Sequence, residues 1–188
     1  MSKVAAAVSP VLPWRRLTFP VDWAEQFGVA PLHLEIGFGD GRYTVRRALE
    51  EPEAMFVGLE ISSASIQRAL AKVRRAGVDN VALLKVGANF AVKNLFAPQS
   101  LSSITVNFPD PWPKERHLKN RLLQRSFFEL AASRLVPAGT LRLATDHPDY
   151  LLFALQEAEA SGLFAAHEAE PPAAVFETKY ALKWKGQG

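Results

Sequence analysis

Short apolar segments of strand length alternate along most of this chain with segments that have the hydrophobic spacing of helices. Two parallel strands cannot be joined by a tight turn, whereas a crossover of helix length joins them readily. The alternation therefore predicts an α/β fold with an open, mostly parallel sheet flanked by helices. Strands are expected at residues 31–36, 54–61, 81–86, 101–108, 141–144 and 162–168, and helices at residues 42–50, between Ser62 and Gly77, and at 89–96, 121–135 and 150–160.

The first 30 residues lack this alternation. They contain three prolines at positions 10, 13 and 20 and the basic pair Arg15 and Arg16, without a sustained hydrophobic period. We expect an irregular N-terminal arm over residues 1–30, packed on one domain over residues 31–188 and able to add positive charge to a binding face. A chain of 188 residues with 48% hydrophobic residues is long enough for one sizeable core.

The amino-acid composition limits the cellular compartment and the kinds of chemistry that we expect of this protein. The chain has no cysteine, which excludes disulfides, thiolate zinc sites and cysteine nucleophiles and fits a reducing compartment. The apolar stretch from Val4 to Val8 has only five residues and is followed by prolines, so it is too short for a signal peptide or a membrane span. We therefore expect a cytoplasmic protein without membrane contact, and no residue pattern points to a metal site.

Polar residues follow five of the expected strands. Because the carboxyl ends of parallel strands lie at one edge of a sheet, where open α/β folds bind ligands, these residues are expected to share one site. They are Glu35 with Gly37, Gly39 and Gly41 after the first strand, Glu60 after the second, Gly87, Ala88 and Asn89 after the third, Asp110 after the fourth and Asp146 after the fifth.

The glycine turn narrows the ligand class. A G-x-G-x-G pattern is weak by itself, but here it stands between a strand and a helix, and Glu60 follows Gly39 by 21 residues. That spacing matches a nucleoside site, with glycines that let the backbone approach the ligand and an acid that accepts the ribose hydroxyl protons. The chain lacks the G-x-G-x-x-G turn of dehydrogenases and the Gly-Lys-Ser/Thr ending of a P-loop.

The segment Asn107–Arg121, NFPDPWPKERHLKNR, combines a rigid acid with concentrated positive charge. Asp110 stands between two prolines where a strand ends, and residues 114–121 hold four Lys or Arg against one Glu, a net charge of +3 that equals the charge of the whole chain. Clustered cations beside a fixed carboxylate predict a polyanionic partner delivered to the site that the acid serves. The cations are Lys114, Arg116, Lys119 and Arg121.

Four blocks of the sequence together resemble the bacterial tRNA (guanine-N7-)-methyltransferase family, over residues from about Leu34 to Gly186. This resemblance implies a Rossmann-like class I fold that uses S-adenosyl-L-methionine to methylate N7 of a guanosine in the tRNA variable loop. We expect a monomer or a homodimer. The block at 108–121 is the most specific of the four. The blocks are EIGFGDG at 35–41, GLE at 58–60, FPDPWPK with the cations that follow it at 108–121, and ATD at 144–146.

The resemblance also implies roles for individual residues. Asp110 is expected to be catalytic, and the cofactor is expected to contact Glu35, Gly37, Gly39, Glu60, Gly87, Ala88 and Asp110. The substrate is expected to contact Lys114, Arg116, Lys119, Arg121 and Asp146, together with Thr178 and Tyr180 of a C-terminal motif.

The chain departs from the family pattern in three places. Gly87 stands where the family commonly has Asp, so the adenosine contact there is expected from the backbone or from Asn89. Ala181 stands where the family's Thr-x-x-Glu motif ends in Glu, and Glu177 is a candidate substitute. Members of the family are expected to continue into another strand after the position of Gly186, whereas this sequence stops at Gly188.

The chemistry of guanine N7 limits the role of Asp110. N7 carries a free lone pair and no proton, so methyl transfer to it needs no general base, and we expect Asp110 to orient the base and stabilise its developing positive charge. Two alternatives remain open from the sequence. One is a methyltransferase that acts on another RNA base, and the other is an RNA-binding module without catalytic activity on the same fold.

Overall fold

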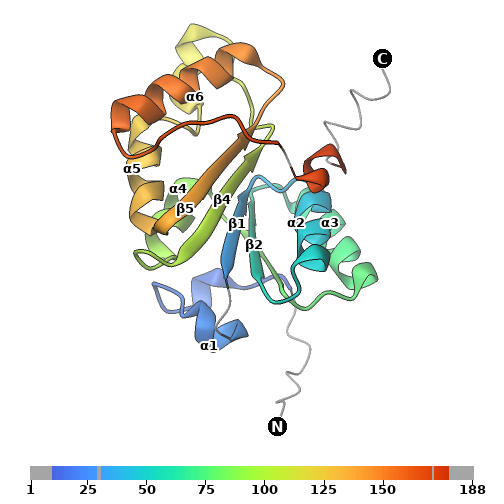
Figure 1. The fold of residues 1–188 in the computed structure, drawn as a ribbon. Coiled ribbons are helices and arrows are strands. Elements are labelled where there is room, and N and C mark those ends of the chain that lie inside the picture. The colour runs from blue at the N-terminus through green and yellow to red at the C-terminus, as the bar shows by residue number, and fades with distance from the viewer. Residues whose placement is uncertain (1–9, 29–30, 171, 178–188) are drawn as a thin grey trace.

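The computed structural model describes residues 10–28, 31–170 and 172–177, which form a twisted sheet with helices on both faces (Figure 1). The described residues contribute five strands in the order β3-β2-β1-β4-β5, and every neighbouring pair is parallel. The predicted α/β fold with a parallel sheet is therefore confirmed. The strands are β1 (Leu32–Ile36), β2 (Met55–Glu60), β3 (Val81–Lys85), β4 (Leu101–Asn107) and β5 (Leu135–Ala144).

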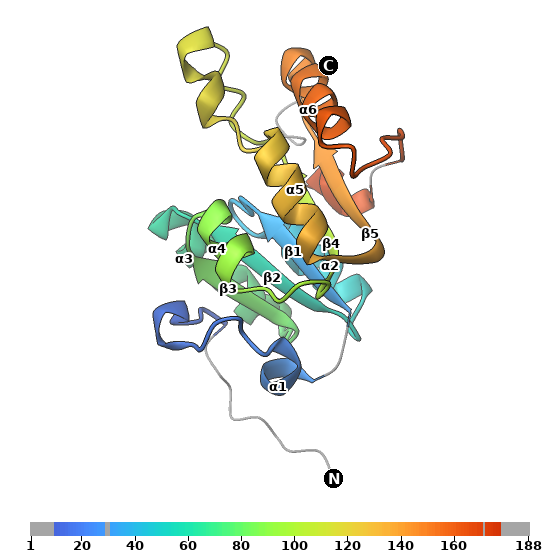
Figure 2. The same cartoon turned by 90° about the vertical axis from the view of Figure 1, so that its left-hand side faces the viewer.

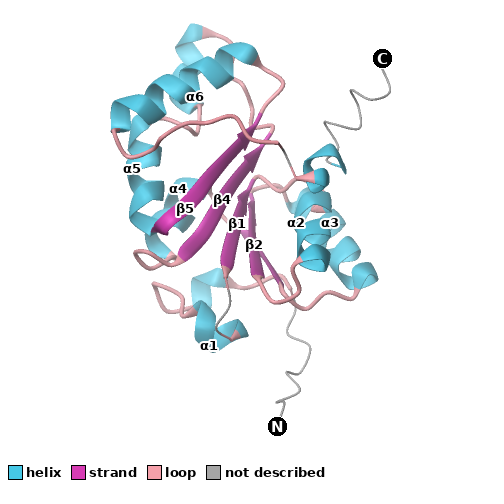
Figure 3. Ribbon diagram, viewed as in Figure 1, coloured by secondary structure: helices cyan, strands magenta, loops and turns pink. Residues whose placement is uncertain are grey.

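The helices form a layer on each face of the sheet. Helices α2 and α3 pack together on one face, α4 and α5 pack together on the other, and α6 lies against α5 (Figure 3). The longest have 14 residues, and no helix in the described ranges combines the length and hydropathy needed to cross a bilayer. The helices are α1 (Trp23–Phe27), α2 (Arg42–Glu50), α3 (Ser63–Ala76), α4 (Ala88–Asn94), α5 (Arg125–Arg134) and α6 (Pro148–Ser161), with the short 3-10 helices η1 (Trp14–Arg16), η2 (Glu115–Asn120) and η3 (Ala173–Glu177).

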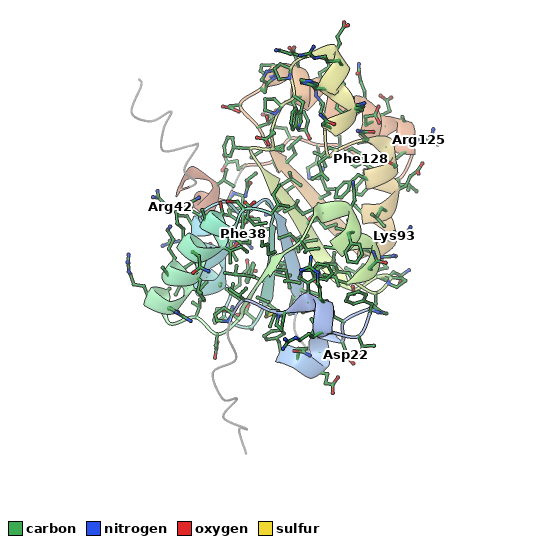
Figure 4. All side chains as sticks on the ribbon, turned by 180° about the vertical axis from the view of Figure 1, so that it is seen from behind. Asp22, Phe38, Arg42, Lys93, Arg125 and Phe128 are labelled. Atoms are coloured by element: carbon green, nitrogen blue, oxygen red, sulfur yellow. The ribbon has the colours of Figure 1, made fainter. Side chains whose placement is uncertain are left out.

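Strand side chains alternate between the two apolar layers. In β2, Met55, Val57 and Leu59 pack with α4 and α5, whereas Phe56 packs with α2 and α3. Burial on both faces explains why β2 is a nearly continuous apolar run instead of an alternating one. Gly58, on the same side as Phe56, leaves room for the ring of Phe38, which lies in the interior (Figure 4).

Local sequence signals set both ends of α3. The hydroxyl oxygen of Ser62 accepts the backbone N–H of Ser65 at the N-cap, at 3.3 Å. Gly77 takes a left-handed conformation at the C-cap, with φ of +67°, which glycine adopts without a steric penalty. Both caps were predictable because they depend on neighbouring residues only.

The expected strand at residues 162–168 is wrong. Gly162 caps α6 in a left-handed conformation, and residues 164–170 continue without regular secondary structure. Leu163 is exposed, and Phe164 packs edge-on against Phe128 of α5, with ring centroids 5.5 Å apart. The apolar side chains of this segment thus meet solvent or a helix, and none of them gains the sheet face that would stabilise a strand.

The boundaries of α5 and β5 also differ from expectation. Residues 115–120 form η2, so α5 begins at Arg125 instead of Arg121, and β5 begins at Leu135 instead of Leu141. The β4–β5 register shifts between the Leu101–Leu135 and Ser103–Thr140 pairs, so residues 136–139 bulge. The bulge contains a proline and lies on the strand at the end of the described sheet, where a missing amide hydrogen is tolerated.

The described part of the N-terminal arm packs on the sheet and its helices, and it holds η1 and α1 as well as irregular chain. Val11 forms a parallel bridge with Leu83 and so covers part of the outer edge of β3. The indole N–H of Trp23 donates to the carbonyl of Leu95 at 3.2 Å, and its ring stacks on Phe96 at 5.4 Å. The arm is therefore held by β3 and α4.

We expect Gly58→Ala to destabilise the fold. An added Cβ would lie 2.5 Å from Cδ1 of Phe38, and a ring this well buried cannot move away without disturbing its layer. Overpacking of this kind costs about 1–3 kcal/mol of the free energy of unfolding, measurable by urea denaturation. Gly87→Ala is the control, because no atom lies within 4 Å of its added Cβ and its cost should stay at or below about 1 kcal/mol. Equal losses in the two variants would contradict this account.

Candidate active site

The carboxyl ends of β1, β2 and β4 border a cavity of about 480 Å³, here called the active cavity. It lies where the strand order reverses between β1 and β4, the position at which open α/β sheets bind ligands. Among the predicted site residues, the structure brings Glu35, Gly37, Gly39, Glu60, Ala88 and Asp110 to its lining.

The glycine turn between β1 and α2 forms one wall. Gly37, Gly39 and Gly41 all have positive φ, at +72°, +58° and +78°, which disfavours any larger residue. Gly41 is also required by space, since an added Cβ would lie 2.6 Å from the Cβ of Ala69 on α3. The turn therefore brings backbone close to the cavity and keeps α2 tight against α3.

Glu60 ties this turn to the start of α3. One carboxylate oxygen accepts the N–H of Gly39 at 3.2 Å, and the other accepts those of Ile61 at 2.7 Å and Ser62 at 3.0 Å. Three backbone donors fix the carboxylate at the end of β2, with lone pairs remaining for a ligand in the cavity.

Glu35 is the most deeply buried acid of the site, with 5% of its surface exposed. Its carboxylate accepts hydrogen bonds from the hydroxyl of Thr44 and from the amide of Asn107, the latter at 3.1 Å. Burial, with a smaller contribution from the charge of Asp40, raises the pKa of Glu35 from about 4.5 to about 7, against the opposing effect of these two hydrogen bonds. A cation in the cavity would favour the ionised form.

Asp110 stands in a strained loop at the end of β4. Phe108 and Trp112, two residues before and after it, have φ of +48° and +44°, which bulky residues rarely adopt. Prolines at 109 and 111 restrict the same loop, and the N–H of Phe108 donates to the carbonyl of Ala144 at 2.7 Å. The loop holds an exposed carboxylate at the rim of the cavity.

Arg121 is placed differently from the other three predicted cations. It is 6% exposed, its guanidinium lies over the rings of Phe153 and Tyr150 at 4.7 and 5.2 Å, and its Nε donates to the carbonyl of Pro111 at 2.9 Å. Through these contacts the guanidinium holds the Asp110 loop against α6. The phosphate contact that the sequence predicted for Arg121 does not fit this buried position.

The remaining cations, Lys114, Arg116 and Lys119, are exposed on η2 and its N-cap. Figure 2 shows this segment projecting from the body of the domain beyond the carboxyl ends of the strands. Asp146, by contrast, is exposed after β5 and does not line the active cavity, and Gly87 caps α4 outside the lining. Thr178, Tyr180 and Ala181 lie outside the described residues.

The structure also adds residues that the sequence analysis did not assign to the site. Asn107 and Thr44 hold Glu35, and Arg68 of α3 and Asn120 of η2 line the cavity. Asn107 could have been found as a polar residue ending a buried strand. Arg68 and Asn120 face the cavity, and Thr44 reaches Glu35, only because helices pack at particular angles, which no local pattern encodes.

The residues present fit a positively charged nucleoside. Acids outnumber cations among the described lining residues, and glycine backbone is presented beside them. The acids are Glu35, Asp40, Glu60 and Asp110, and the cations are Arg42 and Arg68. Asp40 is paired with Arg42 at 3.0 Å and with Lys72 at 3.1 Å, which leaves the other three to act on a ligand. Within the described ranges, no group of three or more His, Cys, Asp or Glu is arranged to hold a metal ion.

Comparison with known proteins agrees with a cavity that fits a positively charged nucleoside. Residues 29–188 match the family described as "Putative methyltransferase". The chain belongs to this methyltransferase family. Among its relatives, the tRNA (guanine-N(7)-)-methyltransferase of Thermus thermophilus is 48% identical over 95% of this chain and 58% of the relative, and that of Deinococcus radiodurans is 46% identical over 84% and 49%. The chain thus spans about half the length of the curated relatives it matches.

Solved structures share the fold at low sequence identity. The 16S rRNA methyltransferase KamB superposes with a TM-score of 0.58 at 17% identity, over 82% of this chain and 80% of that one. An antibiotic-related methyltransferase gives 0.56 at 18% identity, over 74% and 72%. The predicted Rossmann-like methyltransferase fold is confirmed for this family member.

We expect Glu35→Gln to change how stability depends on pH. Folded wild type keeps the Glu35 proton up to about pH 7, whereas the unfolded chain releases it near pH 4.5, so this group lowers the free energy of unfolding as pH rises between those values. The variant has no proton to lose at this position, so its free energy of unfolding should rise relative to that of wild type between about pH 4.5 and pH 7. Above that range the difference between the two proteins should stay constant. Urea denaturation at pH 5, 6, 7 and 8 measures this difference.

The control is Glu53→Gln, which removes an exposed carboxylate far from the cavity lining. Its stability difference from wild type should stay near zero throughout. A Glu35→Gln difference that did not change with pH would show that Glu35 is ionised in the folded protein across the range.

Proposed function

We propose that this chain catalyses transfer of a methyl group from S-adenosyl-L-methionine to N7 of a guanosine in the variable loop of tRNA. The proposal depends on one observation: a single loop joins a negatively charged cavity to a positively charged surface. The loop that holds Asp110 against the acidic active cavity continues directly into the exposed cations of η2. The names of the relatives supply the base and the RNA class.

The active cavity has the groups that this cofactor requires. S-adenosylmethionine, when bound, supplies a methyl group attached to a positively charged sulfur. Glu60 would accept protons from its ribose, Gly37, Gly39 and Ala88 would let it approach the backbone, and Glu35 would offset its positive charge. Gly87 lies outside the cavity lining, so a contact with the adenine there falls to Ala88.

Asp110 would act on the guanine and not as a base. N7 has no proton to lose, and methylation places positive charge on the ring. A carboxylate held between two prolines can accept N–H groups of the guanine and stabilise that charge without reorganising. Because the loop is fixed by Arg121 and by the N–H of Phe108, the carboxylate is positioned before the RNA arrives.

The cations of η2 would bind tRNA phosphates. Lys114, Arg116 and Lys119 are exposed, and the segment that carries them projects beyond the strand ends, where an RNA too large for the cavity could reach it (Figure 2). Phosphate contacts of this kind fix position without reading sequence, and they weaken with salt as counterions are released.

Methyl transfer itself is the primary test. With labelled S-adenosylmethionine and unmodified tRNA, the wild-type chain should produce 7-methylguanosine. We expect Asp110→Ala to lower the single-turnover rate at least about 100-fold while tRNA affinity stays within about twofold, because an electrostatic contact to the reacting base is lost. The control is Asp79→Ala, because Asp79 is exposed and lies just before the amino end of β3, away from the carboxyl ends that border the cavity.

Two results would count against the proposal. Binding of tRNA and cofactor without labelled product would favour an RNA-binding module, and label in another nucleoside would favour a methyltransferase of different base specificity. Unchanged turnover in Asp110→Ala would remove that carboxylate from the mechanism.

Charge reversal on η2 should alter tRNA binding and its salt dependence. The double variant Arg116→Glu and Lys119→Glu should weaken binding at low salt and reduce the slope of log K against log salt by about one to two, as one or two phosphate contacts are lost. Lys93→Glu is the matched control, since Lys93 is exposed at the end of α4, away from η2 (Figure 4). A slope unaltered in the double variant would reject η2 as the RNA contact.

A further inference from the structure

A second cavity, of about 660 Å³, adjoins the active cavity. The two share Trp112, Asn120 and Leu122, so the loop after Asp110 forms the wall between them. The rest of the second cavity is built from the start of α4, the end of η2 and the start of α5. Its lining beyond the shared wall is Asn89, Lys119, Arg121, Gln124, Ser126 and Phe127.

The two cavities differ in charge. Four acidic residues and two arginines, Arg42 and Arg68, line the active cavity, so acids predominate there, whereas none of the described residues that line the second cavity is acidic. Lys119 is exposed there and supplies a cation, and Asn89, Asn120 and Gln124 supply amide groups. The active cavity therefore suits a cationic ligand, and the second suits an anionic one that also offers hydrogen-bonding edges.

Gln124 is oriented by the backbone of the loop it faces. Its side-chain nitrogen donates to the carbonyls of Lys119 and Arg121, at 2.8 and 3.0 Å. With the nitrogen engaged, the amide oxygen is the group that remains to accept a hydrogen bond. An amide held in this way can hydrogen-bond to the edge of an unpaired base.

Trp112 provides an aromatic surface at the boundary. Its side chain is partly exposed, and the ring of His117 meets it edge-on with centroids 5.7 Å apart. This contact, together with the restricted backbone of the loop, limits the positions that the indole can adopt. A base could stack against such a ring whatever its identity.

The geometry points to a binding site for the nucleotide adjacent to the target guanosine, with its base against Trp112 and its phosphate near Lys119. This inference rests on the proposed function. An enzyme that modifies a base inside folded RNA must draw that base out of its stack, which leaves a neighbouring base without a stacking partner. Trp112 stands between the two cavities, where it can replace the lost contact.

The test combines a filled cavity with altered RNA. Ser126→Trp places a bulky side chain at an exposed position in the lining near the start of α5, beside Arg125 in Figure 4. Ser133→Trp, an exposed position at the other end of the same helix, is the control. Each protein is assayed with unmodified tRNA and with two tRNAs in which the nucleotide before or after the target guanosine is abasic.

For wild type and Ser133→Trp, we expect one of the two abasic tRNAs to bind about tenfold or more weakly than intact tRNA, as a stacked base is lost. Ser126→Trp should bind intact tRNA about tenfold or more weakly than wild type does. Removing the same base from the tRNA should then weaken the binding of this variant by less than about twofold. Cofactor affinity should be unchanged in both variants, because neither residue lines the active cavity.

The inference would be overturned if the abasic tRNA lost as much affinity for Ser126→Trp as it does for wild type. It would also be overturned if Ser126→Trp bound intact tRNA with wild-type affinity. If Ser126→Trp does not fold by its thermal transition, Ser126→Phe, which also fills the lining but with a smaller ring, is put through the same cycle, with the same result required. The proposed function is judged separately, because wild type that methylates intact tRNA while showing no abasic penalty disproves only the second site.

Discussion

The parallel pairing of β1 with β4 is the constraint on which the site depends. This pairing aligns Ile36 with Val106, so the glycine turn after β1 and the Asp110 loop after β4 leave the sheet side by side. It also brings the amide of Asn107 to the carboxylate of Glu35, across 72 positions of sequence. Without that register, the acids at the strand ends would not share one cavity.

Charge is then divided between the two sides of one rigid loop. The acidic active cavity lies on one side, and the cations of η2 and the second cavity lie on the other. Arg121 holds the division in place, because its buried guanidinium fastens Pro111 to the aromatic rings of α6. In the proposed function, this division would let a cationic cofactor and an anionic RNA bind next to each other without competing for the same groups.

Sequence reasoning succeeded where neighbouring residues decide the outcome. The caps at Ser62 and Gly77 and the apolar run of β2 follow from local chemistry. Glu35, Glu60 and Asp110 line one cavity, and each lies at or just beyond the carboxyl end of a strand. Sequence reasoning failed at residues 162–168, where apolar residues meet a helix and solvent instead of a sheet. It also treated Arg121 as one more exposed cation, because a charge run does not reveal which member turns inward.

By itself, the sequence determined the parallel α/β architecture, the glycine turn and the set of acids at the strand ends, since period, spacing and turn chemistry are properties of adjacent residues. Only the tertiary structure decided which of those residues share a cavity and what surrounds them. The burial that raises the pKa of Glu35, the inward turn of Arg121 and the second cavity behind Trp112 all arise from elements distant in sequence, whose packing no local pattern encodes.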